Sequence, residues 1–178
     1  SVEMAKKYNV ELEVLSSLEH KPGTIVKETV KMEKTLIRGV AKDNNVTRVS
    51  IVGVPDTPGI AYKIFSLLSA KKINVDIILQ SVGRDGTKDI VFTVAGDQME
   101  ETKAALEASD ILKTAKVDFD NEVTKLSIVG AGMETHPGVA TKMFEALFEH
   151  DINIQMIATS EIKISVLIDK KDAERAVK

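Results

Sequence analysis

An internal repeat constrains the fold of this chain more than any other feature. The segment from Val46 to Ser81 is similar to the segment from Val123 to Ser160, with one two-residue insertion before a shared Pro-Gly pair. Six of the first eight positions are identical. Nine further residues recur 79 positions later, namely Pro58, Gly59, Ala61, Lys63, Phe65, Leu68, Ile73, Asn74 and Ser81. A repeat of this length indicates two copies of one supersecondary unit.

The first half of each copy has a strand, a turn and a helix. Apolar and polar residues alternate over 49–53, which predicts a strand, and apolar residues at 60, 64, 67 and 68 predict a helix with one buried stripe. Thr57 is a natural N-cap for this helix, and Pro58 suits its first position. A second strand is expected over 73–80, with Ile73, Val75, Ile77 and Leu79 facing the helices.

The rest of the first copy adds a strand, a helix and a last strand. Gly83 to Gly86 reads as a turn, and apolar residues at 90, 92 and 94 predict the strand after it. Asp97 and Glu100 form a predicted capping box for a helix that ends near Ala108. A last strand is expected over Lys116–Phe119. The first copy is therefore predicted to be a βαββαβ unit.

The second copy lacks a last strand of its own. A second helix is expected to begin at Asp169, but the chain stops at Lys178. The segment Thr35–Ala41 is strand-like and belongs to no element of the first copy. We infer that it completes the second unit, so that the first unit is inserted into the second. The alternative is that a terminal strand is missing from the chain. The expected fold class is α+β, with two ferredoxin-like βαββαβ domains in tandem.

Composition excludes several functional classes. The chain has 178 residues and a formal net charge of -3, so no basic surface for nucleic acid is expected. It has no cysteine and three isolated histidines, so no metal site is expected. No apolar run reaches the roughly 18 residues that span a membrane, and no signal pattern begins the chain. We expect a cytoplasmic protein. Because residue 1 is serine, we expect a fragment or a processed subunit.

The same topology also serves RNA-binding modules and acylphosphatase-like enzymes. An RNA-binding sheet would present stacked aromatic residues, whereas the strands around Phe92 are mostly aliphatic. A small phosphatase would need an arginine in its phosphate-binding loop, whereas the loop 56–59 reads Asp-Thr-Pro-Gly. Neither class fits these residues.

Four segments resemble the regulatory region of aspartate kinases, which is a tandem pair of ACT domains. They read LIRGVAKDNNVTRVSIVGVPDTPGIAYKIF, INVDIILQS, KLSIVGAGMETHPGVATKMFEAL and INIQMIATSEIKISVLI. Upstream, MAKKYNVELEVLSSLEHKPGTIV resembles the last helix and strand of the kinase's catalytic domain. The resemblance implies a catalytic-domain remnant and linker over 1–24, a first ACT domain over 46–121, and a second over 30–45 plus 122–178.

The resemblance also implies a function. In this family, end-product amino acids inhibit the phosphorylation of aspartate by ATP on its side-chain carboxylate, the first committed step toward lysine, threonine and methionine. Lysine and threonine are the usual effectors. The catalytic domain or subunit would be a separate part, so this chain is expected to have no catalytic activity and no cofactor. ATP and magnesium are implied only for the kinase domain.

Two groups of residues are candidates for an effector site. The N–H groups at the helix start near Gly59 can hold a carboxylate, although Asp-Thr-Pro-Gly is also simply a good turn. Asn74, Asp76 and Gln80 are expected on one strand face, which is equally compatible with a solvated surface. With the positions that the resemblance implies, the candidates are Asp56, Pro58, Gly59, Ile60, Ala61, Asn74, Asp76, Gln80, Asn153, Ile154, Ser160 and Glu161.

Association with a second copy is also expected. The apolar residues Ile78 and Ile157 fall on strand faces that are otherwise polar, which predicts a homodimer through the ACT domains. The effector would then bind between the first domain of one chain and the second domain of the other. The alternative functions are a structural dimerisation module and an ACT sensor of another amino-acid enzyme.

Overall fold

The structure is a computed structural model that describes residues 5, 8, 10–17, 22–26, 37–130 and 138–177. The chain forms two compact units, Ser1–Thr35 and Leu36–Lys178, and each is described by itself. In the first unit, β1 (Leu12–Val14) pairs antiparallel with β2 (Thr24–Val26). The helix expected at the start of the chain lies mostly outside the described residues.

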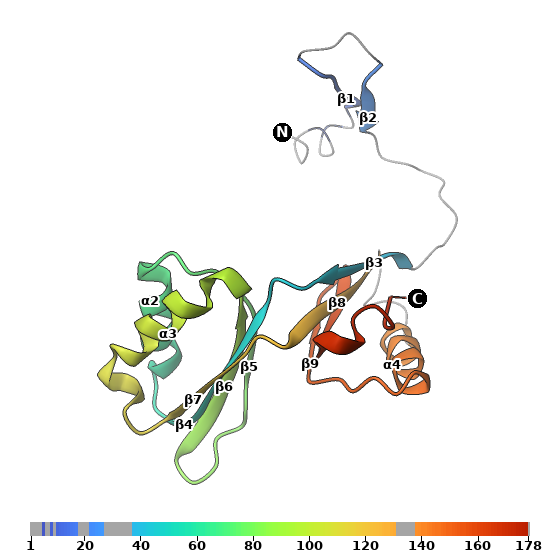
Figure 1. Cartoon of the computed structure of the whole chain (residues 1–178). Helices are drawn as coiled ribbons and strands as arrows, with labels where there is room; N and C mark the ends of the chain where they lie inside the picture. The colour runs from blue at the N-terminus through green and yellow to red at the C-terminus, as the bar shows by residue number, and fades with distance from the viewer. Residues whose placement is uncertain are drawn as a thin grey trace. The chain divides into compact units, whose positions relative to one another are not determined.

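The second unit contains two four-stranded antiparallel sheets (Figure 1). The first sheet has the order β5-β6-β4-β7. Its strands are β4 (Thr47–Pro55), β5 (Val75–Gln80), β6 (Thr87–Val94) and β7 (Lys116–Asp120). Its helices are α2 (Ile60–Ala70) and α3 (Met99–Glu107), with 3-10 turns η1 (Gly96–Gln98) and η2 (Asp110–Leu112). We call residues 47–120 the first module, and its element order is the βαββαβ order predicted.

The second sheet has the order β3-β8-β10-β9. Its strands are β3 (Ile37–Asp43), β8 (Val123–Gly130), β9 (Met156–Thr159) and β10 (Lys163–Asp169). We call these strands, with α4 (Val139–Glu149) and the 3-10 turn η4 (Lys170–Asp172), the second module. β3 precedes the first module in sequence and pairs with β8, with Val40 opposite Ile128. This is the pairing expected for the segment 35–41, of which Thr35 and Leu36 lie outside the described residues.

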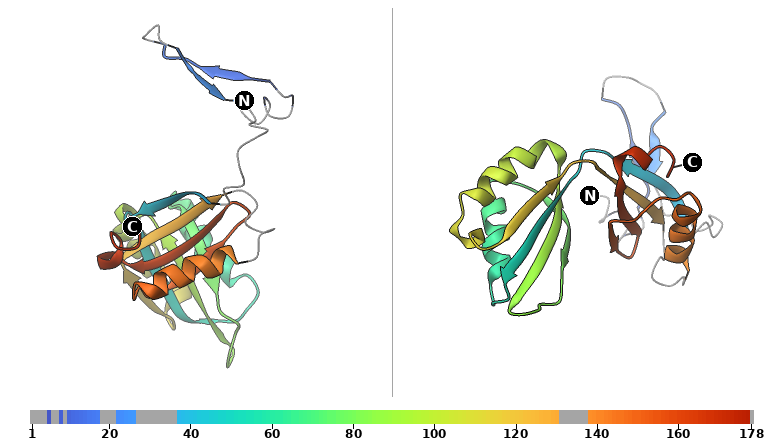
Figure 2. Two further views of the ribbon diagram at one scale, coloured as in Figure 1. Left: turned by 90° about the vertical axis from the view of Figure 1, so that its right-hand side faces the viewer. Right: turned by 60° about the horizontal axis from the view of Figure 1, so that its bottom comes forward.

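Each module buries one face of its sheet under helices (Figure 2). In the first module, Ile64 and Leu68 of α2 are fully buried against Phe92 of β6. Phe92 also meets Phe65 in an edge-to-face contact, with ring centroids 5.3 Å apart. In the second module, Met143 and Leu147 of α4 occupy the equivalent places in a separate core. Burial of these apolar side chains provides the main driving force for each module.

Three helix predictions need correction. α2 begins at Ile60 after Gly59, whose φ of 86° is in the left-handed region. Thr57 is therefore not the N-cap, and Pro58 lies two residues before the first helical position. α3 begins at Met99 with no side-chain cap among the described residues, so the predicted capping box is wrong. The backbone N–H of Asp97 instead donates to Asn45 Oδ1 at 3.2 Å.

The helix expected at Asp169 is also wrong. Only the 3-10 turn Lys170–Asp172 forms, and turns follow it to the end of the described residues. Ala173 is buried there, so the segment still covers part of the second module. A short turn can bury one small apolar residue without the stripe that an amphipathic helix would need.

The prediction of which β5 side chains face the helices is wrong for the residues after Val75. The pairing of β5 with β6 shifts between Val75 and Ile78, where the N–H of Ile77 donates to Thr93 Oγ1 at 3.0 Å. Beyond the shift, Ile78 lies opposite Phe92 and Gln80 lies opposite Ile90. Since directly opposite residues share a face, both lie on the helix side. Gln80 therefore does not share a face with Asp76 as predicted, and Ile78 is not on the open face.

The second module has the same change of face. Ile152 and Ile154 pack in the helix-side core, whereas Met156 packs in a different cluster on the open side of the sheet. Ile157 lies opposite Val166 and hence on the helix side, not on the open face as predicted. The apolar residues that alternate from 152 to 158 therefore lie on both sides of the sheet. The reason is that the backbone is not a regular strand before Met156.

A third apolar cluster joins the two modules. Its buried members are Val46 and Ile77 on one side and Val123, Met156 and Leu167 on the other, with Val91 and Ala158 packed against them. The open faces of the two sheets therefore bury apolar residues against each other. No helix within the described residues is long and apolar enough to cross a membrane.

Candidate functional site

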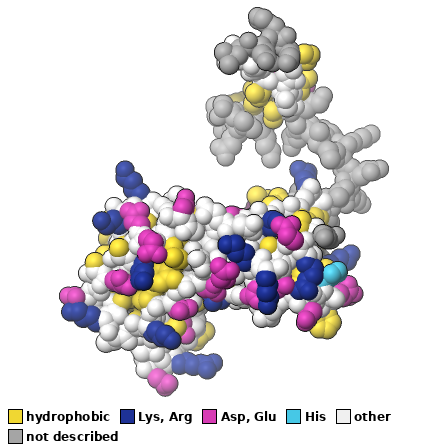
Figure 3. Space-filling model, viewed as in Figure 1, with side chains coloured by type: hydrophobic (Ala, Val, Ile, Leu, Met, Phe, Trp, Pro, Cys, Tyr) yellow, Lys and Arg dark blue, Asp and Glu magenta, His cyan; other side chains and the backbone are white. Residues whose placement is uncertain are grey.

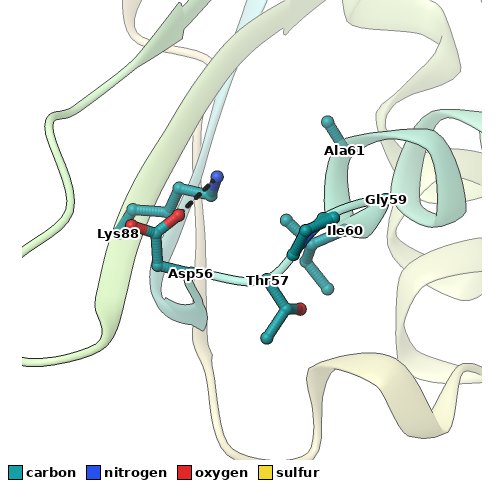
Figure 4. A pocket seen from close by; sticks show the side chains of 7 residues that line it. Asp56, Thr57, Gly59, Ile60, Ala61 and Lys88 are labelled. Atoms are coloured by element: carbon teal, nitrogen blue, oxygen red, sulfur yellow. Dashed lines mark ion pairs between the residues drawn. The ribbon is translucent and has the colours of Figure 1, made fainter.

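A cleft of about 400 Å³ lies where α2 begins beside β6 (Figure 4). Its lining residues are Asp56, Thr57, Pro58, Gly59, Ile60, Ala61 and Lys88. The loop after β4 supplies most of them, and β6 supplies Lys88. Five of the predicted effector residues, Asp56, Pro58, Gly59, Ile60 and Ala61, therefore come together in one cleft.

Backbone geometry holds the loop in place. Gly53 bulges from β4 at a φ of 78°, and its N–H donates to Asp89 Oδ1 at 2.9 Å. The N–H of Asp56 donates to the carbonyl of Gly86 at 2.9 Å, which ties the loop to the hairpin between β5 and β6. Gly59 then turns the chain into α2. The N–H of Ile60 donates to the carbonyl of Thr57 at 3.3 Å, whereas those of Ala61 and Tyr62 have no acceptor within the helix and can hold a negatively charged group.

An ion pair occupies one wall of the cleft. Lys88 Nζ lies 2.8 Å from Asp56 Oδ1, and Figure 4 shows the two side chains pointing toward each other. The lysine side chain is 12% exposed and the aspartate side chain is 43% exposed. Gly83 lies so close that an added Cβ would overlap the Asp56 carboxylate. The pair is therefore well enclosed on the lysine side and fixed in position.

Sequence reasoning missed Lys88. Val54 lies opposite Lys88 in the β4–β6 pair, so Lys88 shares the helix-side face with Ile90 and Phe92. A lysine in phase with core residues needs a partner of opposite charge. The two-residue spacing of Lys88, Ile90 and Phe92 could have indicated that Lys88 faces the helices. Asp56, which directly follows the paired strand β4, is the acidic residue that could have been proposed as its partner.

A second cleft, of about 360 Å³, adjoins the first and shares Lys88 with it. It is lined by Ser81, Val82, Arg84, Thr87, Lys88 and Asp89. The hairpin turn beside it has Asp85 and Gly86 at φ values of 51° and 74°, as in a type I′ turn. The turn predicted over Gly83–Gly86 is thus confirmed.

The other predicted effector residues do not line this cleft. Asn74 is exposed before β5, Gln80 is exposed on β5, and Asp76 pairs with the second module. In the second module, Asn153 and Glu161 are exposed. Ile154 packs against the helix-side core, and Ser160 Oγ donates to the carbonyl of Lys163 at 3.3 Å. Within one chain, these residues are not brought to the loop 56–61.

Lys125 of β8 connects the two modules through Asp76. Its Nζ lies 2.7 Å from Asp76 Oδ2 and 3.3 Å from Asp43 Oδ2. The hydrogen bond from Lys125 lowers the pKa of Asp76, against a smaller opposing effect of burial. Burial alone would lower the pKa of Lys125, but the hydrogen bond and charge of Asp76, with help from Asp43, raise it. Both shifts favour the charged pair.

Arg48 of β4 makes a second connection between the modules. Its Nη2 donates to Asp120 Oδ2 of β7 at 2.9 Å, and its Nη1 donates to Gln155 Oε1 of the second module. Gln155 in turn donates through Nε2 to Asp169 Oδ1 of β10. The chain of donors and acceptors links both sheets through partly buried groups, where hydrogen bonds to charge are strong.

The distribution of surface charge agrees with the small formal net charge of -3. Lysine, arginine and acidic side chains are interspersed on the face shown in Figure 3. Within the described residues, no group of three or more histidine, cysteine or acidic side chains could hold a metal ion.

A family model described as an ACT domain matches residues 49–109 and 126–178. The chain belongs to the ACT domain family. Within that family it is similar to the regulatory regions of aspartate kinases, as its sequence predicted. The aspartokinase of Helicobacter pylori strain 26695 is 48% identical over 183 residues, which cover 100% of this chain and 45% of the relative. The aspartate kinase of Pseudomonas putida is 46% identical over 181 residues, which cover 100% of this chain and 44% of the relative. The chain thus spans about 45% of the length of these curated relatives.

Solved structures give the same relationship. The regulatory subunit of aspartate kinase from Thermus thermophilus, in its ligand-free form, is 38% identical with a TM-score of 0.77. That match covers 80% of this chain and 95% of the solved one. A structure of aspartokinase alpha and beta subunits is 46% identical with a TM-score of 0.73, covering 79% and 93%. The two-module fold is that of aspartate kinase regulatory subunits.

Proposed function

We propose that this chain senses end-product amino acids for an aspartate kinase. Lysine and/or threonine would bind in the cleft around residues 56–61 and inhibit the transfer of phosphate from ATP to the aspartate side chain. The single observation that carries the proposal is that five of the residues implied by the family resemblance line one cleft at the start of α2. Both ends of an α-amino acid find a complement there.

The chemistry of the cleft supports an amino-acid ligand. The carboxylate would meet the N–H groups of Gly59 and Ala61, because that of Ile60 donates to the carbonyl of Thr57, and the helix dipole favours negative charge there by about 0.3–1 kcal/mol. The ammonium would meet Asp56, which is the acidic residue lining the cleft. Gly59 has no side chain, and no heavy atom of a described residue outside its immediate neighbours lies within 4 Å of the position where a Cβ would be. A ligand can therefore approach the backbone closely.

We propose that the rest of the site comes from a second chain. Asn153, Ile154, Ser160 and Glu161 of that chain would complete the cleft in a homodimer. A ligand that touches both chains binds the closed arrangement better than any rearranged one, and only such a difference in affinity shifts a conformational equilibrium. Coupling of about 1–3 kcal/mol would be enough for feedback inhibition.

The division of labour in the parent protein follows from this proposal. Residues 1–24 would belong to the end of the catalytic part and its linker, 46–121 to the first ACT domain, and 30–45 with 122–178 to the second. Phosphoryl transfer, and the ATP and magnesium that it needs, would reside in the kinase part. The parent enzyme would act in the cytoplasm, in the synthesis of lysine, threonine and methionine.

Calorimetric titration of the purified chain with lysine and with threonine tests the proposal directly. Ala61→Glu would place a carboxylate in the first turn of α2, where the ligand's carboxylate should sit, and should weaken binding at least about tenfold. Tyr62→Glu is the matched control, because Tyr62 is the next residue and is 77% exposed outside the cleft. If neither amino acid binds the wild-type chain, the sensing function is wrong. If both variants bind as tightly as wild type, the ligand does not occupy this cleft.

The two-chain part has its own test. In the full-length kinase, Asn153→Ala should weaken inhibition by lysine or threonine while the uninhibited turnover stays the same. Sedimentation of the chain with and without ligand should show a dimer. If the chain is a monomer under both conditions, the ligand cleft of one chain remains a valid proposal, but the contribution of a second chain is wrong.

A further inference from the structure

We propose that the two modules are joined by a one-sided hinge, with the contacts of Lys125 as an ionic latch and the contacts of Arg48 as the pivot. The junction consists of these contacts and the third apolar cluster. When the latch opens, the first module swings away from the second on the Lys125 side. The hinge involves the junction and not the cleft, so it does not depend on whether the cleft binds an amino acid.

The junction is packed at one end of the facing sheets. Two short connections, from β3 to β4 and from β7 to β8, run side by side between the modules (Figures 1 and 2). Val46 and Val123, at the starts of β4 and β8, are only 4% and 0% exposed. Val52 and Val129 lie six residues further along the chain and are 44% and 36% exposed. Modules that touch mainly beside their connections have room to change the angle between them.

The repeat makes the two sides of the junction equivalent. Arg48 and Lys125 each follow a Val-Thr pair at the start of a strand. Each pairs with the aspartate that ends the neighbouring edge strand, which is Asp120 for Arg48 and Asp43 for Lys125. The other oxygen of each carboxylate accepts the backbone N–H two residues further along the connection, at 2.9 Å in both cases. Each cation thus also steadies one connection.

The two cations differ in what they reach in the other module. Arg48 donates to the neutral amide of Gln155, which in turn donates to Asp169. Lys125 instead lies 2.7 Å from the carboxylate of Asp76, the residue that is equivalent to Gln155 in the repeat. On the Lys125 side, two carboxylates from different modules therefore share one cation across the junction.

The Lys125 side should open before the Arg48 side. The side chains of Asp43 and Asp76 are 45% and 47% exposed, whereas that of Asp120 is 26% exposed. Salt screens exposed charges more than enclosed ones. Lys125 is also a point charge, whereas Arg48 holds its two acceptors through two nitrogens of a planar group. The Arg48 contacts therefore keep their geometry when the Lys125 pairs weaken.

Distances between two spin labels test the hinge. The chain has no cysteine, so a pair of introduced cysteines places both labels. One pair, Arg38 on β3 and Asn74 before β5, reports on the latch side. The other pair, Lys116 on β7 and Asn153 before β9, occupies corresponding places and reports on the pivot side. All four residues are exposed.

Substitution of Lys125 should open the latch. Lys125→Met keeps a long side chain but removes the shared cation, so Asp43 and Asp76 repel each other. The latch-side distance should then grow by at least about 2 Å, as in other rearranged interfaces, while the pivot-side distance stays the same. Lys125→Arg keeps the charge and should keep both distances. Adding Asp76→Asn to Lys125→Met removes the repulsion and should return the latch-side distance toward that of wild type.

High salt tests the wild-type chain without any variant at the junction. In about 1 M NaCl, where charges are screened beyond about 3 Å, the latch-side distance should grow and the pivot-side distance should not. Circular dichroism checks that each variant is folded. If Lys125→Met and high salt both leave the latch-side distance unchanged, the hinge is wrong. It is also wrong if both distances grow together, because the modules then separate as a whole.

The double variant decides whether the latch acts through charge. If Lys125→Met with Asp76→Asn is as open as Lys125→Met, the ionic latch is overturned. Should Lys125→Met not fold, the salt series on the wild-type chain still decides between a hinge and a rigid junction.

Discussion

The two modules are alike where their first helix begins and ends, and they differ in how their sheets are completed. Gly59 and Gly138, at equivalent repeat positions, both precede a helix with φ near the left-handed region, at 86° and 97°. Lys72 and Asp151 follow the two helices at φ values of 58° and 53°. The repeated sequence thus produces the same backbone at both helix ends, because these residues act locally.

The completion of each sheet depends on the chain outside the repeat. The first module receives α3 and β7 from the residues after β6, whereas the second receives β3 from upstream and has only η4 after β10. Phe92 and Val166 are equivalent, since the pairs Ile51–Ile90 and Ile128–Ile164 fix the same register in both sheets. The larger side chain lies in the module that has two covering helices. The residues that flank the repeat supply these covering helices, so at this position the module with more helical cover has the larger core residue.

The largest expected effect comes from emptying the two cores at this equivalent position. Phe92→Ala should lower the free energy of unfolding by about 3–5 kcal/mol, because it leaves a cavity beside Phe65 and α2. Val166→Ala removes only two methyl groups and should cost about 2 kcal/mol. Guanidinium unfolding measures both. An equal or larger loss at Val166 would contradict the view that the first module has the more heavily packed core.

The next effect tests whether the modules unfold together. Arg48→Leu removes the donors for Asp120 and Gln155 and leaves both without them, which should cost about 2 kcal/mol. The two modules should then melt in more separate steps, as followed by calorimetry. Arg38→Leu on the exposed strand β3 is the control and should change little. A single unchanged transition in Arg48→Leu would show that the third apolar cluster and the Lys125–Asp76 ion pair couple the modules without Arg48.

The elements of the repeats could be predicted from the sequence because their signals are local. Strand alternation, the buried stripe of α2 and the turn before Thr87 each depend on neighbouring residues. The cleft loop could be located for the same reason, since the turn and the helix start at Gly59 are encoded within a few positions. The family resemblance then gave the loop a function to test.

The side-chain orientation along β5 and the role of Lys88 were harder to predict from the sequence, because both depend on how the strands pair. The hydroxyl of Thr93, sixteen residues away, accepts a hydrogen bond from the N–H of Ile77, where the pairing register of β5 shifts. Beyond the shift, Gln80 lies on the helix side of the sheet. The period of two in the sequence continues through this shift and conceals it. Lys88 likewise gains its partner only when β6 pairs with β4.

A smaller effect compares the two helix starts. Gly59→Ala and Gly138→Ala should each cost about 1–2 kcal/mol, because a Cβ is unfavourable at positive φ although no described atom lies within 4 Å of it. The stability losses, measured by thermal unfolding, should be similar. Binding of threonine should weaken only for Gly59→Ala, whose residue lines the cleft. Unequal stability losses would mean that the repeated geometry is not equally constrained in the two modules.

The smallest effect concerns the ion pair by which the second module holds the first. Asp76→Asn removes the carboxylate that accepts from Lys125. The pKa of Asp76 is lower in the folded chain than its usual value of 3.8, so the stabilisation is present above that value and is lost as the pH falls through the folded pKa. The pKa of Lys125 is raised above 10.5, so its contribution is present below that value and is lost as the pH rises through the folded pKa. Wild type should therefore exceed Asp76→Asn in stability near pH 6, by less than about 1 kcal/mol because Asp76 is 47% exposed. The difference should decrease as the pH falls below 3.8 and through the folded pKa of Asp76, and it should shrink in high salt. Asp110→Asn, which breaks the exposed pair with Lys113 inside one module, should show a smaller difference near pH 6. A stability difference for Asp76→Asn that persists in acid would show that the carboxylate contributes through packing and not through its charge.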